Sequence, residues 1–157
     1  MEIFKDLISN HVLIVPIVAW ALSQVLKTLT YLLVEKKLDI KRIISDGGMP
    51  SAHSATVTSL MVMCGWNAGF GSALFALSTI FAIVVMRDAV GVRRETGKQA
   101  ASIKELATIV NRAFLDKNAE VRTENLKVLV GHSPLQVVFG SILGFIVSIS
   151  YILIFLV

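Results

Sequence analysis

The chain has 157 residues, of which 55% are hydrophobic and 17% charged, with a net charge of +4. Soluble domains are ordinarily about a quarter charged, so this composition excludes an ordinary soluble domain and favours an integral membrane protein. The basic residues are grouped between apolar runs, which is typical of cytoplasmic loops and argues against a nucleic-acid partner. With a single cysteine, Cys64, no intrachain disulfide can form.

The apolar runs predict one all-α domain, residues 1–157, built as a membrane bundle of about four transmembrane helices. The first run, residues 12–34, is long enough to span, and nothing before it resembles a signal peptide. Residues 55–69 and 70–86 are short and are separated only by turn residues, which favours a helical hairpin. The alternative is a re-entrant or kinked pair that does not cross fully. The last span is residues 134–157, preceded by Ser133 or Gly131.

Residues 87–127 form the longest polar stretch. Apolar residues recur in it at helical spacing, at Ile103, Leu106, Val110, Ala113 and Phe114. This spacing predicts an amphipathic helix that lies on the membrane or over the bundle. If the hairpin crosses fully, the two basic segments share one side, and the positive-inside rule places that side in the cytoplasm and both termini outside.

Residues 46–54 read Asp-Gly-Gly-Met-Pro-Ser-Ala-His-Ser and are followed at once by an apolar run. The glycines and the proline end any preceding helix, and Ser51 or Ser54 can cap the next one. The free N–H groups and positive dipole end of a helix start suit an anion such as phosphate. His53 adds a group that can titrate near neutral pH. The stretch therefore predicts a phosphate site at a membrane surface.

His53 and His132 each lie at the start of a predicted span, on the same predicted face. In phosphoryl transfer, one histidine can attack phosphorus while the other protonates the leaving alkoxide, and arginines bind the phosphoryl oxygens. Gln136 is four residues after His132, so it can hold one imidazole nitrogen. The alternative is that both histidines only cap helices at the membrane interface. The third histidine, His11, lies at the opposite end of the first span and is expected to be an interfacial residue.

Lys27 lies inside the first span, where a lysine is costly unless it snorkels to the interface or faces a polar cavity. Both interpretations stay open, and the second gives Lys27 a role at the site. The two histidines, with Asp46 and Asp88 as oxygen ligands, match no metal-ligand spacing, so no metal site is predicted.

Residues 50–54 resemble the Pro-Ser-Gly-His motif of the type 2 phosphatidic acid phosphatase superfamily, and residues 132–140 resemble its His-x-Pro-x-Asp-Val-x-x-Gly motif. With Asp-Ala-x-Gly-Val-Arg-Arg at residues 88–94, the chain is similar to the divergent, short membrane branch, labelled acid phosphatase/vanadium-dependent haloperoxidase-related. The resemblance runs from about Gln24 to the C-terminus. It implies a helical bundle with the site at the helix ends, a lipid phosphate substrate, and no metal or other cofactor.

By this resemblance, His132 is the nucleophile and His53 the general acid. Candidates for binding the phosphate are Arg87, Arg93, Arg94, Ser51, Ser54 and Lys27. The superfamily's first motif, a lysine followed seven residues later by Arg-Pro, is absent from the chain. Lys27, Lys41 and Arg42 could replace its basic residues, but none of them has the required spacing. The Ser-Arg expected before the nucleophile is also absent, since position 126 is Leu126.

Gln136 replaces the aspartate of the last motif. A carboxylate would stabilise the imidazolium, whereas an amide can only orient the ring. Three functions are therefore weighed. The favoured one is a phosphatase that hydrolyses a lipid phosphate monoester or pyrophosphate through a phosphohistidine, at the cytoplasmic face of a bacterial plasma membrane. The others are a non-catalytic binder or carrier of a phosphorylated lipid and a structural membrane subunit. A homo-oligomer is compatible with each.

Overall fold

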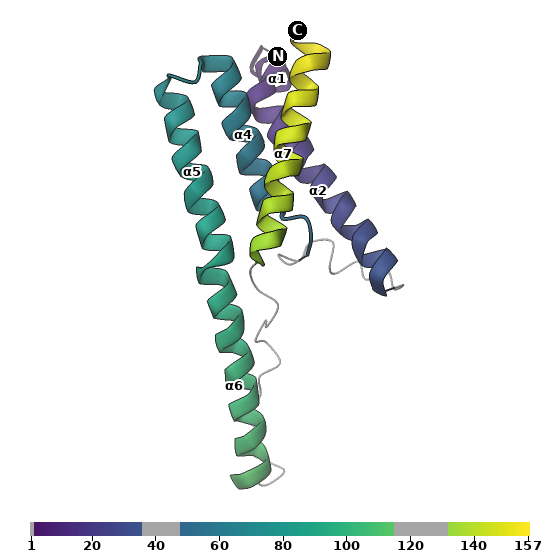
Figure 1. Ribbon diagram of the computed structural model, residues 1–157, viewed down its shortest axis with the longest axis vertical. Coiled ribbons are helices and arrows are strands. Elements are labelled where there is room, and N and C mark those ends of the chain that lie inside the picture. The colour runs from purple at the N-terminus through teal and green to yellow at the C-terminus, as the bar shows by residue number, and fades with distance from the viewer. Residues whose placement is uncertain (1, 36–47, 115–131) are drawn as a thin grey trace.

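The computed structural model describes residues 2–35, 48–114 and 132–157, and these residues contain helices and no strand. The helices are α1 (Glu2–Ser9), α2 (His11–Glu35), α4 (Ala52–Ala68), α5 (Ala73–Val90), α6 (Val92–Phe114) and α7 (Pro134–Phe155). Helices α2, α4, α5 and α7 form a bundle, and α6 extends beyond it in the direction of α5 (Figure 1). The predicted all-α architecture is confirmed.

About four transmembrane helices were predicted, two of them short. Within the described residues, three stretches are long and apolar enough to cross a membrane, namely His11–Leu33, Ala73–Ala113 and Pro134–Phe155. The second predicted span is instead α4, which has only 17 residues and packs against α2, α5 and α7. At 1.5 Å per residue it is about 25 Å long, slightly less than the ~30 Å hydrocarbon layer. Burial by its neighbours lets α4 carry several hydroxyl side chains.

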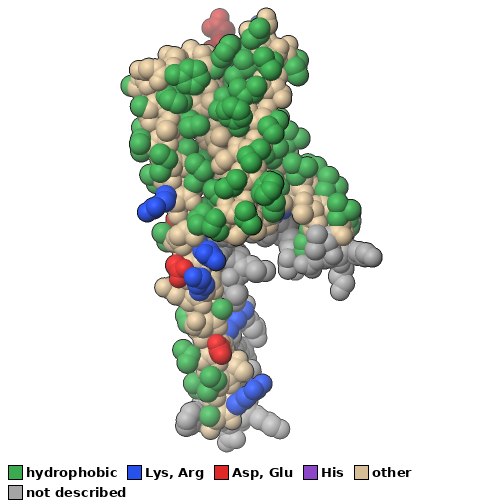
Figure 2. Space-filling model, viewed as in Figure 1, with side chains coloured by type: hydrophobic (Ala, Val, Ile, Leu, Met, Phe, Trp, Pro, Cys, Tyr) green, Lys and Arg blue, Asp and Glu red, His purple; other side chains and the backbone are tan. Residues whose placement is uncertain are grey.

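The surface of the bundle is apolar. Figure 2 shows hydrophobic side chains over the visible face of the bundle, with charged side chains at one end and along α6. Leu77 and Ile80 on α5 and Leu153 on α7 are each at least 60% exposed. An apolar surface of this extent marks a face that meets lipid. The bundle is therefore the membrane-embedded part of the chain.

The predicted amphipathic helix is α6, and it does not lie over the bundle. Among the described elements it contacts only α5, from which Gly91 separates it. Its exposed apolar side chains include Ile103, Leu106 and Val110. The helical spacing of these residues was read correctly from the sequence, but amphipathicity specifies a face and not a direction. Helix α6 continues the line of α5 and projects from one end of the bundle (Figure 1).

Helices α4 and α7 meet along a line of small residues, which we call the α4–α7 seam. It comprises Ser51, Ala55 and Ser59 on α4 and Gly140, Gly144 and Ser148 on α7. A Cβ atom on Gly140 would collide with the carbonyl oxygen of Ser51, and one on Gly144 with that of Ala55. Small residues let two helix backbones approach this closely in a membrane. The Oγ atoms of Ser148 and Ser59 lie 2.8 Å apart in a buried hydrogen bond.

The seam brings the first turns of α4 and α7 together. Ser51 is the N-cap of α4, and its Oγ accepts a hydrogen bond from the Ser54 N–H at 3.4 Å. Ser133 is the N-cap of α7, and Pro134 occupies the first turn. The Ser51 N–H donates to the Gln136 carbonyl oxygen at 3.0 Å, which fixes the two helix starts relative to each other. Both chain termini lie at the other end of the bundle (Figure 1).

Candidate active site

The structure brings His53 and His132 together. His53 lies in the first turn of α4, and His132 comes just before the N-cap of α7. Their ring centroids are 5.7 Å apart with an edge-on interplanar angle of 63°. The His132 N–H donates to the Ala89 carbonyl oxygen of α5 at 2.9 Å, and the residue is only 3% exposed. Three helices thus fix the position of this imidazole.

Gln136 determines which nitrogen of His132 carries the proton. The Ser133 N–H donates to Gln136 Oε1 at 3.0 Å, and His132 Nδ1 lies 3.2 Å from the same oxygen. A backbone N–H can only donate, so the amide oxygen must face both groups. His132 Nδ1 is then the protonated nitrogen, and Nε2 of the neutral ring carries the lone pair. An unprotonated imidazole nitrogen is the form of the ring that can act as a nucleophile.

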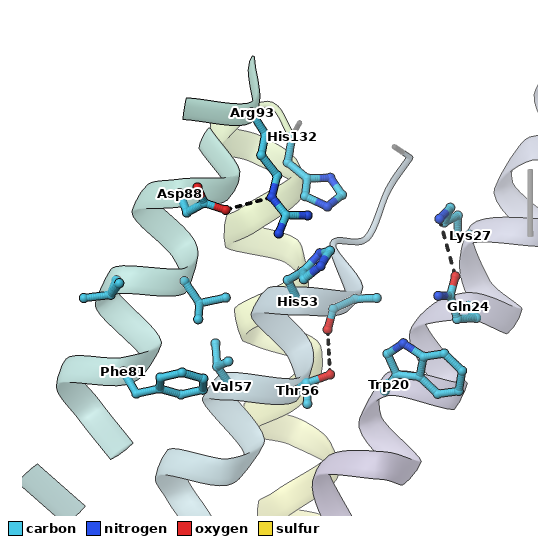
Figure 3. A pocket seen from close by; sticks show the side chains of 13 residues that line it. Trp20, Gln24, Lys27, His53, Thr56, Val57, Phe81, Asp88, Arg93 and His132 are labelled. Atoms are coloured by element: carbon cyan, nitrogen blue, oxygen red, sulfur yellow. Dashed lines mark hydrogen bonds and ion pairs between the residues drawn. The ribbon is translucent and has the colours of Figure 1, made fainter. Parts of the chain in front are cut away.

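Arg93 places a guanidinium beside the histidines. Its Nε donates to Asp88 Oδ2 at 2.7 Å. A guanidinium has five N–H donors in a fixed plane, so this bond leaves the two terminal nitrogens directed elsewhere. Figure 3 shows them pointing toward the rings of His53 and His132. A bidentate donor next to two imidazoles is suited to phosphoryl oxygens.

Lys27 supplies a second cation from α2. Its side chain is 8% exposed, and Nζ donates to Gln24 Oε1 at 3.4 Å. The backbone of Gly48, with φ +109°, lies against the methylene stem, because a Cβ at Gly48 would come within 3.0 Å of two stem carbons. A lysine this buried does not snorkel into solvent. The structure therefore supports the polar-cavity interpretation of Lys27.

These groups line one pocket with a volume of about 710 Å³. Its polar and charged lining residues are Gln24, Lys27, Thr56, His53, Asp88, Arg93 and His132. Lys27 and Arg93 bring two positive charges and Asp88 one negative charge, before any protonation of the histidines. Among the described lining residues, positive charge thus exceeds negative charge at this end of the pocket, which favours an anion there.

Several predicted site residues do not line this pocket. Ser51 and Ser54 are fully buried, and they cap and pack the start of α4. Arg87 and Arg94 are exposed and lie outside the pocket lining. His11 was not predicted to belong to the site, and it lies at the opposite end of the bundle, where its Nδ1 is 2.7 Å from the Tyr151 hydroxyl oxygen. Lys41, Arg42, Asp46 and Leu126 are outside the described residues.

Other lining residues were not identified from the sequence. Trp20 and Gln24 precede Lys27 by seven and three residues, so all three share one face of α2, a spacing that was available in the sequence. The Asp88–Arg93 pair spans five residues across Gly91, where α5 gives way to α6. Five is not a spacing that pairs side chains on one helix, so only the helix break reveals this contact.

The chain matches the sequence profile described as the Divergent PAP2 family over residues 8–147. It belongs to that family. This chain is also 39% identical over 150 residues to "Uncharacterized membrane protein YuiD" of Bacillus subtilis (strain 168). The alignment covers 92% of this chain and 95% of that protein. No solved structure matches the chain. The family resemblance and the bacterial membrane localisation predicted from the motifs and composition are confirmed.

Proposed function

We propose that this Divergent PAP2 family protein is a membrane phosphatase that hydrolyses a lipid phosphate monoester or pyrophosphate through a phosphohistidine. The observation that carries the proposal is the His132 imidazole, which Gln136 orients through Nδ1, next to His53 and Arg93 in one pocket. Family membership supports phosphatase chemistry as the general class.

In the first step, the Nε2 lone pair of His132 forms a bond to phosphorus, and the bond from phosphorus to the leaving oxygen breaks. Protonated His53 gives its proton to that oxygen, which leaves as the lipid alcohol or as the lipid monophosphate. The Nδ1–H of His132 keeps its hydrogen bond to Gln136 while the ring becomes positively charged. The electron pair of the broken bond stays on the leaving oxygen.

In the second step, water attacks the phosphorus of the phosphohistidine. Neutral His53 takes a proton from this water, the nitrogen–phosphorus bond breaks, and its electron pair returns to Nε2 of His132. Orthophosphate leaves, and His53 is again protonated for the next turnover. One histidine thus acts as acid and then as base, and the proton count balances over the cycle.

Arg93 and Lys27 stabilise the charge on the phosphoryl oxygens in both steps. Arg93 offers two terminal nitrogens because Asp88 accepts the Nε–H, and Lys27 offers a compact charge from the other wall of the pocket. Donors already in place at developing negative charge stabilise a transition state without reorganisation. Asp88 acts through Arg93 and is a positioning residue.

Inorganic phosphate release tests the proposal. The detergent-purified protein is supplied with phosphatidic acid, phosphatidylglycerol phosphate or polyprenyl pyrophosphate, with a chelator present. We expect His132→Ala to lower the rate by at least about 1,000-fold, because the nucleophile is lost. The matched control is His11→Ala, which removes a histidine at the far end of the bundle and leaves the rate unchanged. A His132→Ala protein as fast as its parent would sink the phosphohistidine mechanism.

A non-catalytic lipid phosphate binder is the second candidate, and the uncharged Gln136 favours it. An amide orients the His132 ring but does not neutralise the imidazolium that forms in the first step. This candidate predicts saturable binding of the same lipids with no phosphate release by the parent protein. Release by the parent that His132→Ala abolishes would eliminate it.

A further inference from the structure

The pocket has an open side between two helices. Helices α2 and α5 both pack against α4, yet no Cα atom of α2 lies within 8 Å of a Cα atom of α5. The pocket draws its lining from α2, α4 and α5, so α4 is the floor and the other two helices are the walls. A space with a floor and two separate walls is a groove along the bundle surface.

The groove is polar at one end and apolar along its length. Beyond the site, its lining consists of Trp20 on α2, Val57 on α4, and Phe81, Val84 and Val85 on α5. Phe81 precedes Asp88 by seven residues, as Trp20 precedes Lys27, which places both aromatic rings about 10 Å along the bundle from the charged end. Figure 3 shows Trp20 and Phe81 on the side of His53 that faces away from His132.

The walls of the groove belong to the lipid-facing surface. Trp20, Phe81 and Val84 are 49%, 51% and 58% exposed, and they lie within stretches apolar enough to span a membrane. The groove therefore opens sideways into the hydrocarbon layer and not only toward water. Its apolar part is about 10 Å long, compared with about 15 Å for one leaflet of hydrocarbon.

We propose that the groove of Trp20, Val57, Phe81 and Val84 binds the hydrocarbon chain next to the phosphate of the substrate lipid. The substrate then enters sideways from the bilayer between α2 and α5, without leaving the membrane. This inference rests on the proposed function and assigns the part of the lipid that the pocket recognises besides its phosphate.

Charge and polarity together favour a lipid phosphate over a second copy of the chain. An apolar helix seated in the groove would cover the Trp20 end but would place apolar side chains against the charged and polar lining at the Lys27 and Arg93 end. A lipid phosphate matches both ends, because the anion meets the cations and the chain lies along the apolar walls. The order of the two ends also agrees with a lipid whose headgroup lies at the membrane surface.

Substrate selectivity provides the first test. We compare kcat/KM for a long-chain lipid phosphate with kcat/KM for glycerol 3-phosphate, which has no chain. Val84→Phe narrows the groove and is expected to lower this ratio about tenfold, since apolar pockets discriminate by about that factor. Ile83→Phe is the matched control, because Ile83 is exposed on the same helix and does not line the pocket. An equal ratio in the parent and both variants would overturn the proposal.

Binding provides a test that needs no turnover. The chain has two tryptophans, and Trp66 lies near the opposite end of α4, so Trp66→Phe leaves Trp20 as the only indole. In detergent, a phosphatidic acid brominated on its chains should quench Trp20 fluorescence saturably. Diacylglycerol with the same brominated chains should need at least about tenfold higher concentration, because it lacks the anion.

The two tests separate the groove from the phosphatase. One outcome is selective quenching that Val84→Phe weakens and Ile83→Phe does not, with no phosphate release. It would support chain binding in the groove and eliminate the phosphatase proposal. Phosphate release together with equal quenching by both brominated lipids would be consistent with the phosphatase proposal but would overturn the proposal that the groove binds the chain of the substrate lipid. Quenching that is lost as the protein concentration is raised at a fixed lipid-to-protein ratio would assign the groove to a second copy of the chain and would also overturn the proposal.

Discussion

Helix α4 takes part in two surfaces that differ in residue type. In the α4–α7 seam, serine, alanine and glycine let backbones touch, and Ser59 and Ser148 are fully buried. In the groove between α2 and α5, the same helix presents His53, Thr56 and Val57 to a pocket open on one side. The seam fixes where α4 begins relative to α7, and the groove uses the side chains placed there. The tightly packed face of α4 in the seam thus positions the side chains that α4 presents to the pocket.

Gly144→Ala should cause the largest loss of stability, because its Cβ would collide with the Ala55 carbonyl oxygen. Overpacking of this kind costs about 3 kcal/mol of unfolding free energy, to be measured by denaturation in detergent. Gly71→Ala is the matched control, since no atom lies within 4 Å of a Cβ there. If both variants lose the same stability, the close approach of α4 and α7 is not what stabilises the bundle.

Arg93→Lys should have the next largest effect, on catalysis and not on stability. Lysine cannot bond Asp88 and still present two coplanar nitrogens to a phosphoryl group. Loss of one such donor should lower kcat/KM for a lipid phosphate about 100-fold. Arg94→Lys, at an exposed neighbouring position outside the pocket, should change it less than about twofold. Equal losses would show that no single arginine binds the phosphate.

Gln136→Leu should reduce the rate of phosphohistidine formation about tenfold, because one hydrogen bond that selects the His132 tautomer is lost. Gln136→Glu keeps an acceptor for both His132 Nδ1–H and the Ser133 N–H and adds a charge that stabilises the imidazolium. It should therefore be at least as fast as the parent. Rapid-quench measurement of the phosphorylated protein distinguishes the two variants, and a slower Gln136→Glu would contradict the assigned tautomer.

Ser148→Ala should have the smallest effect. It removes the buried hydrogen bond to Ser59 but keeps the small side chain that the α4–α7 seam requires. We expect a loss of about 1 kcal/mol in unfolding free energy in detergent and unchanged phosphate release. A large loss of activity with unchanged stability would mean that the seam contributes to the site more directly than through packing.

Much of the fold followed from the sequence, because apolar run length and helix-capping chemistry are local. The start of α7 at Pro134 after Ser133, and the cap of α4 at Ser51, lay within the predicted alternatives. Residues 55–69 were predicted to be a short span, and α4 is indeed only 17 residues long. Its packing against α2, α5 and α7 could not be predicted, because the length of an apolar run does not show which helices will surround it. The direction of α6 depends on the backbone at Gly91, which no periodicity encodes.

The site was predictable to a similar degree. The proximity of His53 and His132 followed from two helix starts on one face, and the structure places their rings side by side. The choice among three arginines did not follow, because it depends on the register between α5 and α6 across Gly91. Only the observed Asp88–Arg93 contact singles out Arg93. Which of these residues act in catalysis stays a prediction for the variants above.

The capping box at the start of α7 makes Ser133 and Gln136 one mutational unit. The Ser133 N–H fixes the amide oxygen that accepts from His132, while the Ser133 Oγ accepts the Gln136 N–H at 3.4 Å. Residues that share a hydrogen-bond network show non-additive free energies in double-mutant cycles. Fraying of this helix end and loss of the Nδ1–H tautomer of His132 should therefore be coupled, so a substitution at either position should show epistasis with a substitution at the other.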